Sequence, residues 1–206
     1  MPSAIPIVSF FNVALFPGEK YGISGVSFRL KSYRKYRIVT NSDDQANCIL
    51  RLLEGRQQPS SGLIRKQENL FCQSDRLLMG ERVITKKAEE HLGLKGWQFR
   101  FDNRRRSKHY FIDLLGAKHI LFYPVYKLKG EDKMKFTLLS LLFQRSGLIL
   151  ISDIIYRKLE PRQDDLLVEL TQKSQNTLCI FTRKGMKISN LKMENTLNSM
   201  ETIKID

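Results

Sequence analysis

The stretch IVTNSDDQANCILRLLEGRQQPSSGLI (Ile38–Ile64) decides the fold. Its second half is typical of the helix and strand that follow a phosphate-binding loop, because an apolar helical face ends at Gly55 and a turn then leads into a strand. The first half should therefore be that loop. It contains neither glycine nor lysine, the residue types with which such a loop approaches and neutralises a phosphate. The stretch thus predicts a nucleotide-binding frame without the part that holds the nucleotide.

Short apolar segments continue the alternation of strands and helices on both sides of this stretch. Alternating or continuous apolar runs predict strands, and apolar residues at helical spacing predict helices. The predicted strands cover residues 6–16, 26–31, 36–40, 61–66, 69–73, 148–153 and 177–182, and the predicted helices cover 47–55, 83–94, 110–123, 132–144 and 162–175. This order indicates an α/β protein with a parallel sheet, and the closely spaced early strands indicate an antiparallel lobe beside it.

The chain of 206 residues carries 35 Lys+Arg against 21 Asp+Glu, a formal net charge of +14. This excess favours an anionic partner: nucleic acid, a lipid surface or an acidic protein. The stretch QFRFDNRRRSKHY (residues 98–110) combines basic and aromatic side chains and is a candidate for nucleic-acid contact, although a solvated surface is the better interpretation.

Cysteine and histidine spacing gives no sign of a metal site. The three cysteines, Cys48, Cys72 and Cys179, are far apart and odd in number, which indicates a reducing compartment rather than a disulfide framework or a zinc site. The three histidines also lack metal-ligand spacing. We therefore expect no metal and no cofactor. No apolar run reaches the ~18 residues that a membrane span needs, so contact with a membrane would be peripheral.

The order and spacing of four further stretches carry information about the family: LFCQSDRLLM (70–79), LKGEDKMK (128–135), LILISDIIYRKLEPR (148–162) and CIFTRK (179–184). In order and spacing they resemble the Q-loop, signature, Walker B with D-loop, and switch segments of the nucleotide-binding subunits of ABC transporters. The resemblance covers residues 7–185. It implies an ABC-type ATPase fold: a mixed sheet with a P-loop-like core, a trimmed antiparallel β-lobe and a helical lobe at roughly 80–125. Residues 186–206 would form a frayed polar tail.

The resemblance implies that the phosphate-binding positions are degenerate. Thr40, Asp43 and Gln45 fall at the glycines, Ala46 falls at the lysine, and the hydroxyl positions fall to Asn47 and Cys48. Two adjacent aspartates, at 43 and 44, would then face a triphosphate. Two unit charges ~4 Å apart repel each other by about 4 kcal/mol at an effective dielectric constant near 20. This loop should therefore repel ATP.

The other motifs are altered as well. Gln73 takes the Q-loop glutamine position, in a permease-docking groove with Leu77, Leu78 and Met79. In the signature segment, which is Leu128, Lys129, Gly130 and Glu131, the lysine replaces the serine. Two registers of Walker B stay open: its two carboxylate positions are Ser152 and Asp153, or Asp153 and Ile154. The D-loop would contain Glu160 and Pro161, Arg183 replaces the switch histidine, and Phe16 takes the position of the aromatic residue that stacks on adenine.

The leading hypothesis is therefore a non-hydrolysing, pseudo-ATPase subunit. It would bind peripherally at the cytoplasmic side of the inner membrane, contacting an integral-membrane permease, a second nucleotide-binding subunit of the same or another kind, and anionic lipid. The Q-loop segment resembles that of FtsE-type cell-division ATPases. The spacing of 27 residues between Ala46 and Gln73 resembles that of the polysaccharide exporters. One alternative is a basic nucleic-acid-binding α/β protein, although the leading hypothesis does not expect nucleic acid as a partner. The other alternative is a residual ATPase completed by an active partner subunit.

Overall fold

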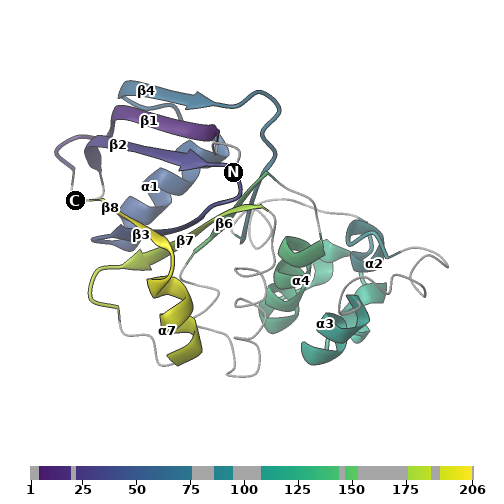
Figure 1. Cartoon of the computed structure of the whole chain (residues 1–206). Coiled ribbons are helices and arrows are strands. Elements are labelled where there is room, and N and C mark those ends of the chain that lie inside the picture. Colours follow the sequence, from purple (N-terminus) through teal and green to yellow (C-terminus); the bar gives the residue numbers. More distant parts are fainter. Residues whose placement is uncertain are drawn as a thin grey trace.

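A computed structural model describes residues 5–19, 22–75, 86–94, 108–143, 147–152, 176–186 and 191–205 (Figure 1). In chain order the elements are β1 (Pro6–Leu15), β2 (Ile23–Lys31), β3 (Lys35–Thr40), α1 (Asp43–Glu54), β4 (Ser61–Lys66), β5 (Cys72–Ser74), α2 (Ala88–His91), α3 (Lys108–Leu114), η3 (His119–Phe122), η4 (Val125–Lys127), α4 (Gly130–Phe143), β6 (Leu148–Ile151), β7 (Thr177–Arg183), α7 (Leu191–Asn198) and β8 (Glu201–Lys204). The predicted helix at 162–175 lies outside the described residues.

A five-stranded parallel sheet, in the order β5-β6-β7-β3-β8, forms the centre of the molecule. Strand β6 (LILI) is apolar and buried at every position because both of its faces are covered, whereas β3 (KYRIVT) alternates buried and half-buried residues. On β6, Leu148 and Leu150 belong to one hydrophobic cluster, and Ile149 and Ile151 belong to a second cluster on the other face. The predicted α/β architecture with a parallel sheet is confirmed.

The last strand corrects an expectation about the C-terminal segment. Residues 186–206 were expected to form a frayed tail, but β8 pairs with β3 from Tyr36↔Glu201 to Val39↔Lys204. The strand has a polar, mostly exposed sequence because it is an edge strand. Its place in the sheet is fixed by pairing with β3, since its own composition carries little strand signal.

A separate three-stranded antiparallel sheet, in the order β2-β1-β4, forms the predicted β-lobe. Its inner face includes Phe10 and Phe28, whose rings stack with centroids 4.4 Å apart. The predicted strand at 26–31 begins earlier, at Ile23, although Gly25 has a φ of 67°. A turn closed by the hydrogen bond from Glu19 N to Phe16 O follows β1.

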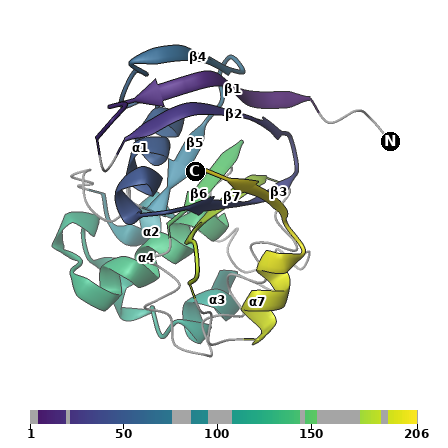
Figure 2. The same ribbon diagram turned by 90° about the vertical axis from the view of Figure 1, so that its left-hand side faces the viewer.

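Helix α1 lies between the two sheets (Figures 1 and 2). As predicted, Ile49, Leu52 and Leu53 are on its buried face, in the same hydrophobic cluster as residues of both sheets. The helix ends at Gly55, whose φ of 75° is left-handed. Lys66 Nζ on β4 donates to the Leu52 and Leu53 carbonyl oxygens at 2.8 and 2.7 Å, so a cation from the β-lobe satisfies the helix C-terminus.

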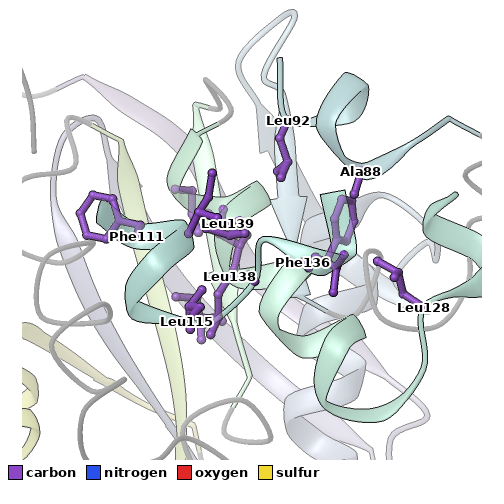
Figure 3. Close-up of a cluster of buried hydrophobic side chains, with 14 of the residues drawn as sticks. Ala88, Leu92, Phe111, Leu115, Leu128, Phe136, Leu138 and Leu139 are labelled. Carbon is purple, nitrogen blue, oxygen red and sulfur yellow. The ribbon is translucent and has the colours of Figure 1, made fainter. Parts of the chain in front are cut away.

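Helices α2, α3 and α4 and the 3-10 turns η3 and η4 form the helical part, around a second hydrophobic cluster (Figure 3). Phe136, Leu138 and Leu139 of α4 belong to this cluster. The residues of β6 and β7 on the sheet face toward these helices also belong to it: Ile149, Ile151, Leu178 and Ile180. The predicted helix at 110–123 is interrupted, because α3 ends at Leu114 and Gly116 has a φ of 57°. Helix α4 corresponds to the predicted helix at 132–144, and the assignment of a helical lobe to roughly 80–125 stays a prediction.

Candidate functional site

The connection between β3 and α1 is the first part of the candidate site. Thr40 ends β3 and Asp43 begins α1, so two residues, Asn41 and Ser42, connect them. Ser42 caps the helix: its Oγ accepts from Gln45 N at 3.1 Å, and Gln45 Oε1 accepts from Asn41 N at 3.0 Å. The helix N-terminus is therefore capped by the chain's own side chains.

Three of the residues placed in the phosphate-binding loop, Asp43, Gln45 and Ala46, lie in the first turn of helix α1 rather than in a loop. Asn47 and Cys48 are in α1 as well, in agreement with the predicted helix at 47–55. The helix therefore begins earlier than predicted, at Asp43. The earlier start has a physical reason, since a serine cap followed by two aspartates and a glutamine is a strong helix N-terminus.

Cys48 stands at a position where a phosphate-binding loop has a hydroxyl. It is 7% exposed and packs in the cluster around α1, so it points into the core. Burial raises the pKa of the Cys48 thiol. Burial and the Glu54 carboxylate raise the pKa of the Cys72 thiol to about 12, and burial also raises that of Cys179. All three cysteines are thus poor nucleophiles.

Arg183, at the switch position, meets one of the loop positions. The register places it beside Thr40 at the carboxyl ends of β7 and β3, and Lys184 N donates to Thr40 O at 2.9 Å. Arg183 Nε lies 3.4 Å from Asp43 Oδ1, although both side chains are partly exposed. An exposed ion pair contributes at most about 1 kcal/mol. The pair places the Arg183 cation against the first turn of α1.

Asp75 is a site residue that sequence reasoning missed. It follows β5, is fully buried, and its Oδ2 accepts from Ser152 N at 2.9 Å and from Ser152 Oγ at 2.5 Å. Ser152 in turn follows β6. The signal was present in the sequence: serine and aspartate directly follow the predicted strand at 69–73 and end the predicted strand at 148–153. An aspartate after a strand of a parallel sheet lies at the edge where open α/β sheets place ligands, and this applies to Asp75.

Most of the Walker B and D-loop residues lie outside the described part of the chain. They are Asp153, Ile154, Glu160 and Pro161. Of the two open registers, the structure places one residue, Ser152, at the carboxyl edge of the parallel sheet, where it contacts Asp75. The choice between the two registers, Ser152 with Asp153 or Asp153 with Ile154, stays a prediction.

Gln73 lies within β5, opposite Ile149 of β6, and is 4% exposed. Its neighbour Ser74 donates from Oγ to Glu54 Oε1 at 2.5 Å, which ties β5 to the end of α1. The Gln73 side chain is thus part of the sheet and does not face solvent. Three other docking candidates, Leu77, Leu78 and Met79, are outside the described residues, so the docking role stays a prediction.

The signature segment begins α4. Leu128 is buried, whereas Lys129 and Glu131 are exposed on either side of Gly130, which has a φ of 51°. Glu131 Oε1 pairs with Lys135 Nζ at 2.6 Å one turn along the helix. These side chains belong to the helical part and not to the sheet edge that holds Thr40, Asp75 and Ser152.

Phe16, at the adenine-stacking position, is 40% exposed and has a φ of 49°, which a bulky residue adopts only under strain. Among the residues that the structure describes, no group of three or more His, Cys, Asp or Glu side chains could hold a metal ion.

None of the helices within the described ranges is long and apolar enough to cross a membrane.

No protein-family model and no curated protein matches the chain. Solved structures do. A bacterial Atm1-family ABC exporter with ATP bound is 15% identical with a TM-score of 0.66, over 100% of this chain and 39% of that one. A transporter assigned to the metal-chelate type of ABC transporters, in an inward-facing conformation, is 15% identical with a TM-score of 0.62, over 98% and 80%. RNase-L Inhibitor is 12% identical with a TM-score of 0.69, over 98% and 37%.

The chain thus spans 39% of the length of the exporter, and the identities of 12 to 15% establish the fold alone. This chain, with its parallel and antiparallel sheets, is similar in fold to these ABC proteins over 98 to 100% of its length. The structure of this chain is a mixed α/β fold of the ABC ATPase type.

Proposed function

We propose that this chain is a non-hydrolysing ABC-type subunit that supports a membrane transport or envelope complex without turning over nucleotide. The observation that carries the proposal is the two-residue connection between β3 and α1. A phosphate-binding loop of the form G-x-x-x-x-G-K places five residues between its first glycine and its lysine, and their backbone N–H groups surround the phosphate. Asn41 and Ser42 are too few to do so.

Charge at this position supports the same proposal. A helix N-terminus attracts anions through its free N–H groups and its dipole. Here the first turn already contains Asp43 and Asp44, and Ser42 satisfies Gln45 N. A nucleotide phosphate at ~4 Å from either aspartate would be repelled by about 4 kcal/mol per charge pair at a dielectric constant near 20. Arg183 offsets part of that repulsion through Asp43.

Hydrolysis also requires a general base that activates water. At the sheet edge, Asp75 is a described carboxylate in a suitable neighbourhood, but it is fully buried and holds Ser152 through two hydrogen bonds. We assign it a structural role. The other Walker B positions, Asp153 and Ile154, lie outside the described residues.

The proposed partners follow from the fold. Two of the similar structures are described as an ABC exporter and an ABC transporter, and on this basis we propose a membrane permease and a second nucleotide-binding subunit as partners, with anionic lipid near the basic surface. From the sequence resemblance we propose cell division or polysaccharide export as the process in which this subunit takes part.

The first test is nucleotide binding. Purified protein titrated with MgATP in a calorimeter should release no heat beyond dilution, because the loop that would hold the phosphates is absent. An active ABC ATPase domain in the same buffer serves as the positive control. Binding with micromolar affinity would contradict the proposal.

The second test is docking. Leu78→Asp should abolish co-purification with a detergent-solubilised membrane protein while leaving the circular dichroism spectrum unchanged, because a charge would enter an apolar docking surface. Leu63→Asp is the matched control, since Leu63 is 47% exposed on β4 and is not one of the docking candidates. Loss of co-purification in both variants, or in neither, would move docking away from residues 73–79. Global unfolding of the Leu78 variant would identify Leu78 as a core residue.

A further inference from the structure

The outer face of the three-stranded sheet carries an arrangement that the proposed function does not use. Figure 1 shows this sheet at the edge of the molecule, with α1 on one side of it. The residues facing away from α1 include Phe11 on the central strand β1, Arg29 on β2, and Leu63 and Arg65 on β4. Both arginines are exposed, and Leu63 is 47% exposed.

The cations of this face are held in position. The Arg29 guanidinium carbon lies 5.7 Å from the centroid of the Phe11 ring, and that of Arg65 lies 5.5 Å from the same centroid. Both arginines stand opposite Ser9 in the strand register, so their Cα atoms are about two strand spacings apart, roughly 10 Å. An aromatic ring between two arginines restricts the guanidinium groups that would otherwise move freely.

The strands of this sheet contain cations and no anions. Their sequences, PIVSFFNVAL, ISGVSFRLK and SGLIRK, include Arg29, Lys31, Arg65 and Lys66 and neither aspartate nor glutamate. Lys66 is directed to the end of α1, which leaves three cations for the outer side. Within the described ranges no ion pair involves Arg29, Lys31 or Arg65, so in a chain of net charge +14 the outer side of this sheet is a basic surface.

Three kinds of anionic partner could meet such a surface, and its composition distinguishes them. Stable binding to a bilayer draws on apolar side chains that insert as well as on charge, but Phe11 lies between two cations and leaves Leu63, its cross-strand neighbour, as the exposed apolar side chain of this face. An acidic peptide would use the arginines and leave the aromatic ring without a role. Single-stranded nucleic acid uses both, because its phosphates pair with arginine and its bases stack on aromatic and guanidinium planes exposed on an open sheet.

We propose that the outer face of the β2-β1-β4 sheet binds single-stranded nucleic acid, with Arg29 and Arg65 contacting phosphates and bases on either side of Phe11. This goes beyond the proposed function and does not depend on it. The basic stretch at 98–110, the candidate for nucleic-acid contact in the sequence, lies largely outside the described residues and offers a competing location.

The test is fluorescence anisotropy of labelled oligo(U) and oligo(dT) of ~12 nucleotides, a length within the range of known single-strand sites. Affinity should fall with salt, since each phosphate contact contributes about 0.7 to the slope of log K against log salt. The double variant Arg29→Gln/Arg65→Gln should bind at least about tenfold more weakly, with a slope less steep by about 1.4.

Two further variants make the result specific. Arg51→Gln/Lys204→Gln removes two exposed charges elsewhere, from α1 and β8, and should change neither affinity nor slope appreciably. Arg65→Lys retains the charge but loses the planar fork, so the slope should be retained while affinity falls. Since Arg29 and Arg65 are exposed, all of these variants should keep the parent's circular dichroism spectrum.

Several outcomes would overturn the proposal. One is equal binding by the parent and the Arg29→Gln/Arg65→Gln variant. Another is complete loss of binding on changing Arg104, Arg105 and Arg106 to glutamine with no effect of the sheet variant. A third is the sheet variant weakening binding to anionic phospholipid vesicles or to poly-glutamate but not to oligonucleotides. The MgATP titration is independent of all three, so failure of this proposal is distinguishable from failure of the proposed function.

Discussion

Asp75 shows how a single buried carboxylate can organise an edge of the parallel sheet. It is fully buried, and an unpaired charge there would cost several kcal/mol. Its Oδ2 accepts from both the backbone N–H and the hydroxyl of Ser152, which joins the ends of β5 and β6. Glu54, with its side chain 2% exposed, accepts from Ser74 one residue earlier. Two buried carboxylates thus fix β5, a strand of three residues, against its neighbours.

Asp75→Asn tests this structural role. The amide keeps the shape but removes the charge and directs an N–H group toward a site built from donors, so the variant should lose about 1–3 kcal/mol of unfolding free energy. Urea denaturation measures it. Asp113→Asn is the control, because Asp113 is exposed and pairs with Lys118 at 2.8 Å, and it should lose less than about 1 kcal/mol. An Asp75→Asn protein as stable as the parent would mean that the carboxylate is kept for a function other than stability.

At the scale of elements, sequence reasoning succeeds where one physical signal dominates. LILI and TLCIFT are apolar on consecutive residues because their faces meet different clusters, and these strands were predicted nearly to the residue. The prediction of one continuous helix over 110–123 was wrong. Gly116 has a positive φ and interrupts the segment, although its apolar residues are spaced as in a helix.

The sequence predicts a strand followed by a helix in the region of β3 and α1, but it does not predict correctly the residue at which the helix begins. The sequence pattern predicts that the helix begins at Asn47, whereas α1 begins at Asp43 with Ser42 as its cap. Propensity alone does not decide between a loop and a helical first turn for Asp43 and Asp44, because aspartate is favourable in both. The pairing of Asp43 with Arg183 depends on two strands meeting, and no local pattern contains it.

At the scale of the whole molecule, two hydrophobic clusters lie on opposite faces of the parallel sheet, and the C-terminal segment contacts both. Leu197 and Met200 belong to the cluster of the helical part, whereas Ile205 belongs to the cluster around α1. Ile205 N also donates to Val39 O at 2.9 Å, continuing the pairing of β8 with β3. The last residues therefore close the sheet beside the strand that leads into α1.

Ile205→Ala tests whether this segment is part of the fold. Ile205 is 4% exposed, and truncating a buried isoleucine to alanine costs about 2–5 kcal/mol through lost burial and the cavity left behind. We expect a loss in that range, near its lower end because the strand lies at a sheet edge that can partly collapse. Lys204→Ala is the matched control: its side chain is exposed one residue away, and its effect should stay within about 0.5 kcal/mol. Urea denaturation of both variants decides the matter. If the two were equally stable, the segment would be frayed in solution as its polar composition predicts, and β3 would be the edge of a four-stranded sheet.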